Sequence, residues 1–185
     1  QAEPAYERAK AVSFYLLYAR RRAEAGDRET CEQIGRGLLG NQQNNVQCAA
    51  LETLVSVLGN QAQPDLLAAM KSESGTFREA ALALADRIPG EEATKQWVEL
   101  LPGVSVPVRV ELIRMLGKRG DASALPALMK ALKDESEEAR LAAITACARL
   151  GGNEALPSLM AVTQSTTNPA EISAMKEALL RLPMK

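Results

Sequence analysis

The chain has 185 residues, of which 46% are hydrophobic and 24% charged, a composition typical of folded proteins and not of disordered or collagen-like ones. Its 22 Lys and Arg residues balance 23 Asp and Glu residues, so the net charge of -1 gives no overall attraction to nucleic acid or to an anionic membrane. The absence of histidine removes the commonest general base and the commonest metal ligand.

Helical patterns fill the chain. Apolar residues recur at the 3.6-residue period, and no window alternates as a strand does, so we predict an all-α fold. One long opening helix, within residues 1–26, precedes five helical pairs over residues 27–185, and all of them are assigned to a single domain, 1–185. In chain order the predicted helices cover residues 4–24, 28–40, 45–58, 63–71, 76–88, 91–101, 106–119, 123–133, 137–150, 154–163 and 169–182.

The opening helix contains the longest apolar stretch of the chain, Ala11–Ala19. This stretch is about half of the ~20 residues that cross a membrane, so we predict no membrane span. The cluster Arg20–Arg22 ends the helix, where positive charge complements the helix dipole, and we do not assign it to nucleic-acid binding.

An offset of 31 residues aligns most of the chain with itself. A single helical pair buries only one face, so the pairs are expected to stack into one continuous core. The aligned columns that we assign to this core include Trp97, and we predict that it is buried. The two clearest columns are Leu51, Leu82, Ile113, Ile144, Met175 and Leu66, Trp97, Leu128, Leu159.

The stretch from Glu138 to Leu159 resembles the HEAT repeat, and more closely the short HEAT-like repeats first described in phycobilisome lyases. Residues Val108–Leu128 look like the same unit, and weaker copies begin at Val46 and Phe77. The resemblance covers residues 28–182 and implies an α-α superhelix, a HEAT-like solenoid whose second helices line a concave surface for binding partners. The opening helix departs from the repeat pattern, so the resemblance says nothing about it.

The segment Gly35–Gly40 satisfies the dinucleotide-binding pattern G-x-G-x-x-G. That pattern functions between a strand and a helix N-terminus, whereas this segment lies inside a predicted helix with no strand before it. We therefore predict no nucleotide and no other cofactor. Glycines at these positions favour close helix packing or a weakly stable helix end.

An arginine column, Arg78, Arg109 and Arg140, follows the same period. Asp134 precedes Arg140 by six residues, on the loop between two helices, and the HEAT resemblance implies a structural ladder of Asp and Arg side chains there. Gly103 and Ser72 occupy the corresponding loop positions of the other units, so Arg109 and Arg78 need other partners.

The three cysteines, Cys31, Cys48 and Cys147, form no C-x-x-C pair and are odd in number. We interpret them as reduced thiols in the core and predict no metal site. A disulfide between Cys31 and Cys48 in an oxidising compartment is the alternative.

Two columns of the second helices point away from the apolar stripe. Five of their ten positions are basic, and these five form a predicted partner-binding ridge: Arg87, Arg114, Lys118, Arg149 and Lys176. The alternative explanation is ordinary complementation of helix dipoles, because several of the cations lie in a last helical turn. The remaining positions are Glu52, Ala83, Thr145, Ser56 and Leu180.

The leading functional hypothesis is a non-catalytic scaffold that binds a protein or peptide in the concave groove. Nucleic-acid binding through the basic ridge is the alternative, although the ridge columns contain no aromatic residue for stacking on bases. We predict no enzymatic activity, because no activated nucleophile or general base is identified. The sequence indicates neither the partner's identity nor a cellular compartment.

Both ends of the chain carry apolar side chains that a terminal repeat cannot cover. We expect the chain to be a segment of a larger protein or to self-associate through one uncapped end. The alternative is that the opening helix caps the first pair and the last leucines tuck inward. The residues concerned are Tyr6, Phe14, Tyr15 and Tyr18 at one end and Leu179, Leu180 and Leu182 at the other.

Overall fold

A computed structural model describes the backbone of residues 3–181, with side chains throughout that range except at residues 3–9, 153 and 181. Helices and short connections make up this part of the chain, with no strand in it, which confirms the all-α prediction. None of its helices combines the length and apolar character that a membrane crossing requires. The α-helices are α1 (Glu3–Glu24), α2 (Arg28–Leu39), α3 (Asn44–Leu58), α4 (Gln63–Met70), α5 (Gly75–Ala85), α6 (Glu91–Leu100), α7 (Val106–Arg119), α8 (Leu125–Ala131), α9 (Glu137–Leu150), α10 (Gly152–Ser165) and α11 (Pro169–Arg181).

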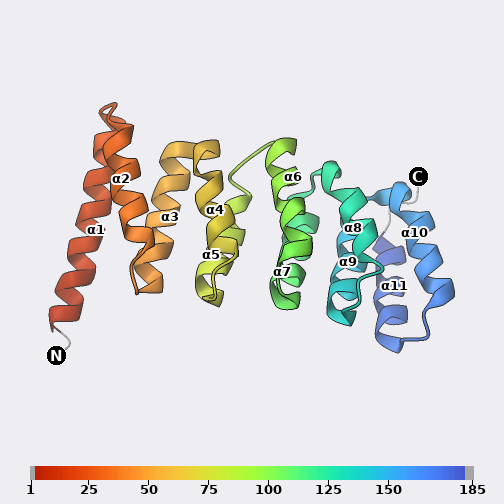
Figure 1. The fold of residues 1–185 in the computed structure, drawn as a ribbon. Helices are drawn as coiled ribbons and strands as arrows, with labels where there is room; N and C mark the ends of the chain where they lie inside the picture. Colours follow the sequence, from red (N-terminus) through yellow and green to blue (C-terminus); the bar gives the residue numbers. More distant parts are fainter. Residues whose placement is uncertain (1–2, 182–185) are drawn as a thin grey trace. The chain divides into compact units, whose positions relative to one another are not determined.

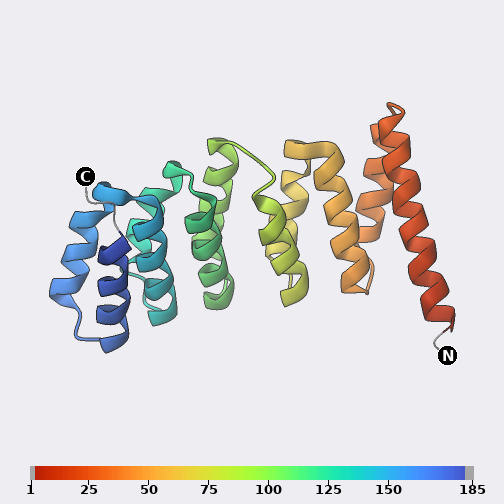
Figure 2. The ribbon, with the colours of Figure 1, turned by 180° about the vertical axis from the view of Figure 1, so that it is seen from behind.

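The helices form two compact units, Gln1–Pro89 with α1 to α5 and Gly90–Lys185 with α6 to α11. In the first unit α2 packs on α3, α4 packs on α5, and α3 contacts α5 (Figures 1 and 2). In the second unit the pairs are α6 with α7, α8 with α9 and α10 with α11, and α9 contacts both α7 and α11. The five predicted helical pairs are therefore confirmed.

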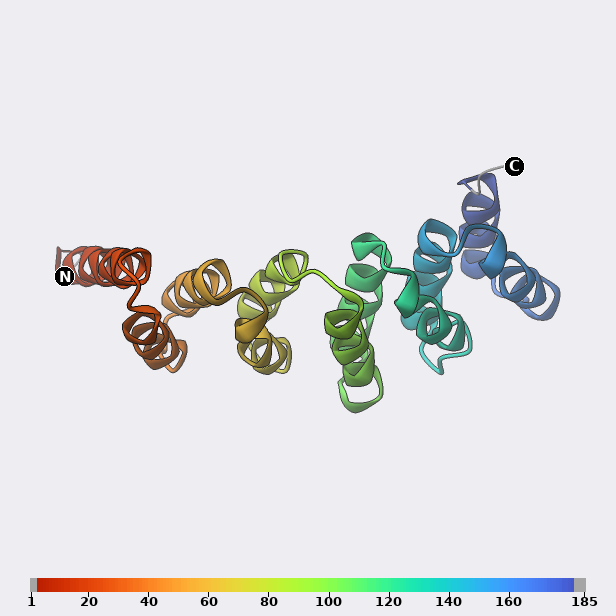
Figure 3. The same ribbon diagram turned by 90° about the horizontal axis from the view of Figure 1, so that it is seen from above.

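The opening helix α1 contacts both α2 and α3. Seen from above, α1 lies in one row with α3 and α5, while α2 and α4 form the other row of the first unit (Figure 3). Although α1 lacks the repeat pattern in sequence, it thus takes the place of a second helix. This arrangement leaves one side of α1 without a neighbouring helix in the unit.

Local sequence explains most helix boundaries. Ser74 and Ser136 cap α5 and α9 by accepting hydrogen bonds from the N–H groups of Phe77 and Ala139. Helix α5 ends at Ala85, three residues before the predicted end at residue 88. Proline disfavours the helical conformation of the residue before it, so Pro89 keeps Ile88 out of the helix.

Two prolines test the predicted starts of the first helices. Pro126 lies in the first turn of α8, as predicted, after the 3₁₀ turn Ala122–Ala124. Pro157 falls in the first turn of the predicted helix 154–163, but α10 begins two residues earlier, at Gly152, so Pro157 lies inside the helix.

The two core columns occupy buried positions. Leu66, Trp97, Leu128 and Leu159 are fully buried, which confirms the assignment of Trp97 to the core. In the other column Leu82 is half-buried and the remaining members are buried. Apolar area removed from water stabilises the fold by roughly 25 cal/mol per Å², so these columns carry much of the stability of each unit.

Glycine allows two close approaches between helices. A Cβ placed on Gly117 of α7 would lie 2.5 Å from the Cβ of Ala146 on α9, and one placed on Gly35 of α2 would lie 2.6 Å from Leu54 Cδ2 on α3. Gly40 is the C-cap of α2. Gly35 confirms the expected role of glycine in close helix packing.

The arginine column is a structural ladder, but one pairing differs from the prediction. Arg140 Nη1 donates to the main-chain carbonyls of Asp134 and Glu135, at 2.8 and 2.9 Å, and its Nε donates to Glu171 Oε1 at 2.8 Å. The predicted pairing of the Asp134 carboxylate with Arg140 is therefore wrong. That carboxylate instead accepts a hydrogen bond of 3.2 Å from Nη2 of Arg109, in the preceding pair.

The partners of Arg109 and Arg78 also lie in the loops between helices. The Nε of Arg109 lies 3.0 Å from Asp134 Oδ2 but has no hydrogen-bond partner, so the Nη2 bond carries this ion pair. Arg78 Nη1 donates to the carbonyls of Ser72 and Glu73, at 2.9 and 3.1 Å. Both Arg78 and Arg140 thus bind main-chain oxygens five and six residues earlier, whatever side chain the loop carries.

Substituting Gly117→Ala is expected to lower the free energy of unfolding by about 1–3 kcal/mol, because the added methyl overpacks the contact with Ala146. Gly37→Ala is the control, since Gly37 is exposed on α2 and a Cβ there meets no atom within 4 Å. This control should gain up to about 1 kcal/mol from helix propensity. Urea unfolding followed by circular dichroism measures the change in unfolding free energy of both variants. Changes of the same sign would contradict the packing argument.

Substituting Arg140→Lys is expected to lower the free energy of unfolding by about 1–3 kcal/mol. A lysine ammonium cannot reproduce the planar arrangement that reaches two carbonyls and the Glu171 carboxylate. Arg149→Lys, at an exposed position of the same helix, is the matched control and should leave thermal unfolding unchanged. An unchanged midpoint for Arg140→Lys would refute the structural role of the ladder.

Glu171 makes the stability of the second unit sensitive to pH. The Thr166 hydroxyl and the Arg140 guanidinium lower the pKa of this buried carboxyl below its ordinary value of 4.5. Its stabilisation is therefore complete above pH 4.5 and is lost as the pH falls through the lowered pKa. The difference in unfolding free energy between the wild type and Glu171→Gln should shrink as the pH falls from 4.5 through the lowered pKa. A difference that does not change with pH would contradict this role of Glu171.

Candidate functional site

The ten positions of the two outward columns are all exposed in the structure. The 31-residue offset thus identified the solvent face of the second helices correctly. Four of the five predicted ridge residues belong to the second unit: Arg114 and Lys118 on α7, Arg149 on α9 and Lys176 on α11. Because α9 contacts both α7 and α11, equivalent positions on these helices place the four cations on one face of this unit.

Three of these cations are not part of an ion pair among the described residues. Arg114, Arg149 and Lys176 form no ion pair with any residue of the described chain. Lys118 and Arg149 lie in the last turns of their helices, where dipole complementation accounts for them. Arg114 and Lys176 lie within α7 and α11, so this explanation does not extend to them.

The fifth ridge residue, Arg87, belongs to the first unit. Its Nη1 lies 3.3 Å from Glu52 Oε1, so an exposed ion pair joins the turn after α5 to α3. An exposed pair of this kind contributes little stability, but it partly neutralises the positive charge. Arg87 therefore differs in its electrostatic surroundings from the cations of the second unit.

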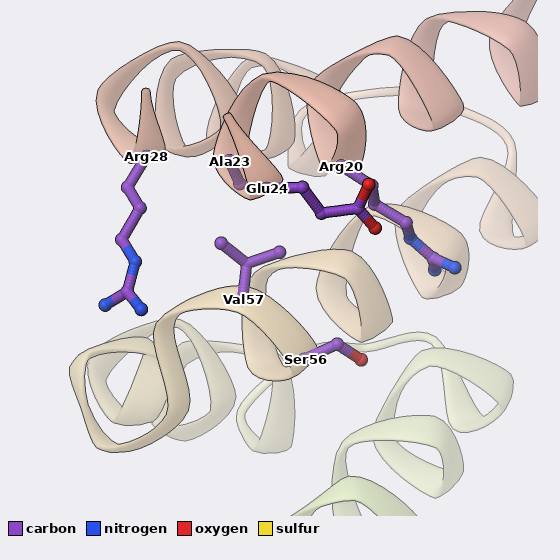
Figure 4. A pocket seen from close by; sticks show the side chains of 6 residues that line it. All are labelled: Arg20, Ala23, Glu24, Arg28, Ser56 and Val57. Atoms are coloured by element: carbon purple, nitrogen blue, oxygen red, sulfur yellow. The ribbon is translucent and has the colours of Figure 1, made fainter. Parts of the chain in front are cut away.

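One pocket lies in the first unit, where α1 meets α2 and α3. It has a volume of about 320 Å³ and is lined by Arg20, Glu24, Arg28 and Ser56, with Ala23 and Val57 between them (Figure 4). Arg20 also donates to the buried Oγ1 of Thr53, at 3.0 and 3.2 Å. Charges of both signs line the pocket, so it does not select an anion or a cation.

A larger pocket of about 790 Å³ lies in the second unit, between the pair α6 and α7 on one side and α8 on the other. Its apolar lining includes Val98, Leu101 and Ile113, and the small residues Ala127 and Ala131 on α8 leave room for it. Its charged residues, again of both signs, are Glu99, Arg109, Lys130, Lys133, Asp134 and Glu135. The sequence did not indicate either pocket, because each depends on the spacing between adjacent helices.

The three cysteines are free thiols, as predicted. Burial raises the pKa of Cys147 to about 12 and also raises that of Cys31, so neither thiol forms a reactive thiolate at neutral pH. Cys48 is half-buried, so the assignment to the core is only partly right for this residue. Over the described residues, no cluster of three His, Cys, Asp or Glu side chains suited to a metal ion is found.

Apolar side chains are exposed at both ends of the described chain. On α1, Phe14, Tyr15, Leu17 and Tyr18 are between 45% and 60% exposed, although Leu16 on the opposite side is buried. The opening helix therefore packs on the first pair without covering its own aromatic side chains. On α11, Leu180 is 87% exposed and Leu179 half-buried, whereas Leu182 and the side chain of Tyr6 lie outside the described residues.

Comparison with known proteins places this geometry in a family. The family model described as HEAT repeats matches residues 94–179, which run from α6 to α11 within the second unit. No curated protein matches the chain. The closer likeness to phycobilisome-lyase repeats is not confirmed and stays a prediction. HEAT repeats generally mediate protein–protein interaction and typically act as non-catalytic scaffolds. Residues 94–179 therefore match the HEAT-repeat family, over a little under half of the chain.

Proposed function

We propose that the chain is a non-catalytic scaffold whose second helices bind an acidic segment of a protein partner. The contact residues are the second-unit ridge, Arg114, Lys118, Arg149 and Lys176. The observation that carries the proposal is that these cations occupy equivalent exposed positions on three neighbouring helices. Arginine and lysine at such positions offer charge-assisted hydrogen bonds to carboxylates without rearrangement of the fold.

Two features favour a partner-binding role over ordinary helix electrostatics. Arg114 and Lys176 lie away from the helix ends, and neither forms an ion pair with another described residue. Neither the helix dipole nor an ion pair within the described residues therefore accounts for these two cations. An acidic partner would supply counter-charges to both.

Nucleic-acid binding is the second candidate. Its support is the same row of cations, and its weakness is that the other second-unit positions of the two columns, Thr145 and Leu180, are not aromatic. Single-stranded nucleic acid is usually held by aromatic stacking as well as charge. We therefore favour a protein partner.

Arg87 extends this proposal to the first unit. It stands 31 residues before Lys118, in the turn that follows α5, but it is already paired with Glu52. A partner carboxylate would have to compete with Glu52 for the guanidinium. We expect Arg87 to contribute less to binding than the second-unit cations.

Reversing three ridge charges, in the variant Arg114→Glu, Lys118→Glu and Arg149→Glu, is expected to abolish partner binding while the circular dichroism spectrum stays helical. All three side chains are exposed, so the change acts on the surface and not on the core. The measurement is affinity capture with wild-type and variant chains as parallel baits, followed by quantification of the retained proteins.

The control carries the same change in net charge at other exposed lysines, Lys71→Glu, Lys130→Glu and Lys133→Glu. It should retain the proteins that the ridge variant loses. Equal retention by all three baits would refute the ridge as the binding site. Retention that disappears after nuclease treatment would favour the nucleic-acid alternative.

A further inference from the structure

We propose that the uncovered side of α1 is a docking site for an amphipathic α-helix of another protein, one with acidic residues beside its apolar stripe. This surface is separate from the ridge of the second helices. Its residues are Phe14, Leu17, Tyr18 and Arg21, which recur at the helical spacing, with Tyr15 at the edge. We call this set the α1 face.

The α1 face is large and apolar for a surface in contact with water. Its four apolar or aromatic side chains are 45–60% exposed, whereas Leu16 and Ala19, on the opposite side of the helix, are buried. Tyrosine and phenylalanine supply much of the binding energy at protein interfaces, because a large area is buried at a small cost in side-chain entropy. A cluster of exposed side chains of this kind is typical of an interaction surface.

The neighbouring helix α3 shows what kind of element covers such a face. Val46 and Thr53 on α3 are buried, and Thr53 accepts hydrogen bonds from Arg20 of α1, so this side of α3 faces α1. On α1 the packed side carries the buried Leu16 and Ala19, and the α1 face lies on the opposite side of the helix.

On α3 this side is covered by a helix of the same row, α1 itself (Figure 3). The α1 face lies at the end of this row and offers a further helix the same kind of contact. The shape of an elongated stripe on a straight helix also suits a helix better than a loop. The occupant that fits the face is thus an α-helix with apolar residues at i, i+3, i+4 and i+7.

Charge indicates which helix fits. Arg21 lies on the α1 face next to Tyr18, is exposed and has no acidic partner among the described residues. Glu24, an exposed acid of α1, instead lines the pocket with Ser56 (Figure 4). An occupant with acidic residues flanking its apolar stripe complements Arg21.

The same charge disfavours a second copy of this chain as the occupant. A parallel, in-register pairing of two α1 helices places Arg21 against Arg21. In any pairing of two copies, the α1 face of one carries no acidic residue to set against Arg21 of the other. The α1 face is therefore complementary to an acidic helix and not to itself.

The test uses the full chain and two synthetic amphipathic helical peptides of about 18 residues, long enough to form several turns. Both carry Leu at the stripe positions, and they differ only in the flanking residues, Glu in one and Lys in the other. Fluorescence anisotropy should show saturable binding of the Glu peptide and binding at least about tenfold weaker of the Lys peptide. Failure of the Glu peptide to bind, or equal binding of the two, would overturn the proposal.

Two variants locate the binding. The double variant Leu17→Glu and Tyr18→Glu should weaken binding of the Glu peptide by about tenfold or more. Its matched control is Met160→Glu and Leu180→Glu, two exposed apolar positions elsewhere on the chain, which should bind as the wild type does. If the control loses binding equally, or if the first variant retains it, the α1 face is not the site.

A third variant leaves the apolar side chains of the α1 face unchanged. Arg21→Glu should weaken binding of the Glu peptide and strengthen binding of the Lys peptide, because only the sign of one exposed charge changes. An unchanged preference would overturn the charge argument. Sedimentation of the wild-type chain over a concentration series completes the test: self-association that Leu17→Glu and Tyr18→Glu abolishes would show that the occupant is a second copy, contrary to the proposal.

Discussion

Each helical pair in this chain depends on the pairs beside it, because two antiparallel helices bury only the strip between them. Within each unit the second helices therefore pack on one another, as α9 does on α7 and α11, and the core columns fill the contacts between them. The same constraint determines which parts of the surface stay uncovered. Second-helix positions outside these contacts are free to bind a partner, and a helix at the end of a row, such as α1, keeps one side uncovered.

The fold could be predicted from the sequence to the extent that it rests on periodicity. The 31-residue offset gave the core columns, the helical pairs and the burial of Trp97, since each follows from spacing alone. Partner choice within the arginine ladder could not be predicted in the same way. Arg140 binds main-chain carbonyls and Glu171, because the loop before α9 turns its carbonyls toward the guanidinium and its Asp134 side chain toward Arg109. Such choices depend on loop conformation, which residue spacing does not specify.

The same distinction, between what residue spacing specifies and what conformation decides, applies to the candidate site. Exposure of the ridge positions followed from the columns, because a helix face is a matter of angle around its axis. The neutralising contact between Arg87 and Glu52 did not follow, since it joins two columns that the offset treats separately. Nor did the position of α1, whose sequence lacks the repeat pattern and whose place in the second-helix row is set by packing against α2 and α3.

The distribution of aromatic residues gives each unit its own optical signal. The single tryptophan, Trp97, is fully buried in the second unit, whereas all three tyrosines of the chain lie on α1 in the first. Tryptophan emission therefore reports the opening of the second unit, and tyrosine absorbance reports the environment of α1. Repeat proteins need not unfold in a single step, since each repeat is stabilised mainly by its nearest neighbours. In this chain the loss of the two signals along one denaturation curve separates the unfolding of the two units without any added label.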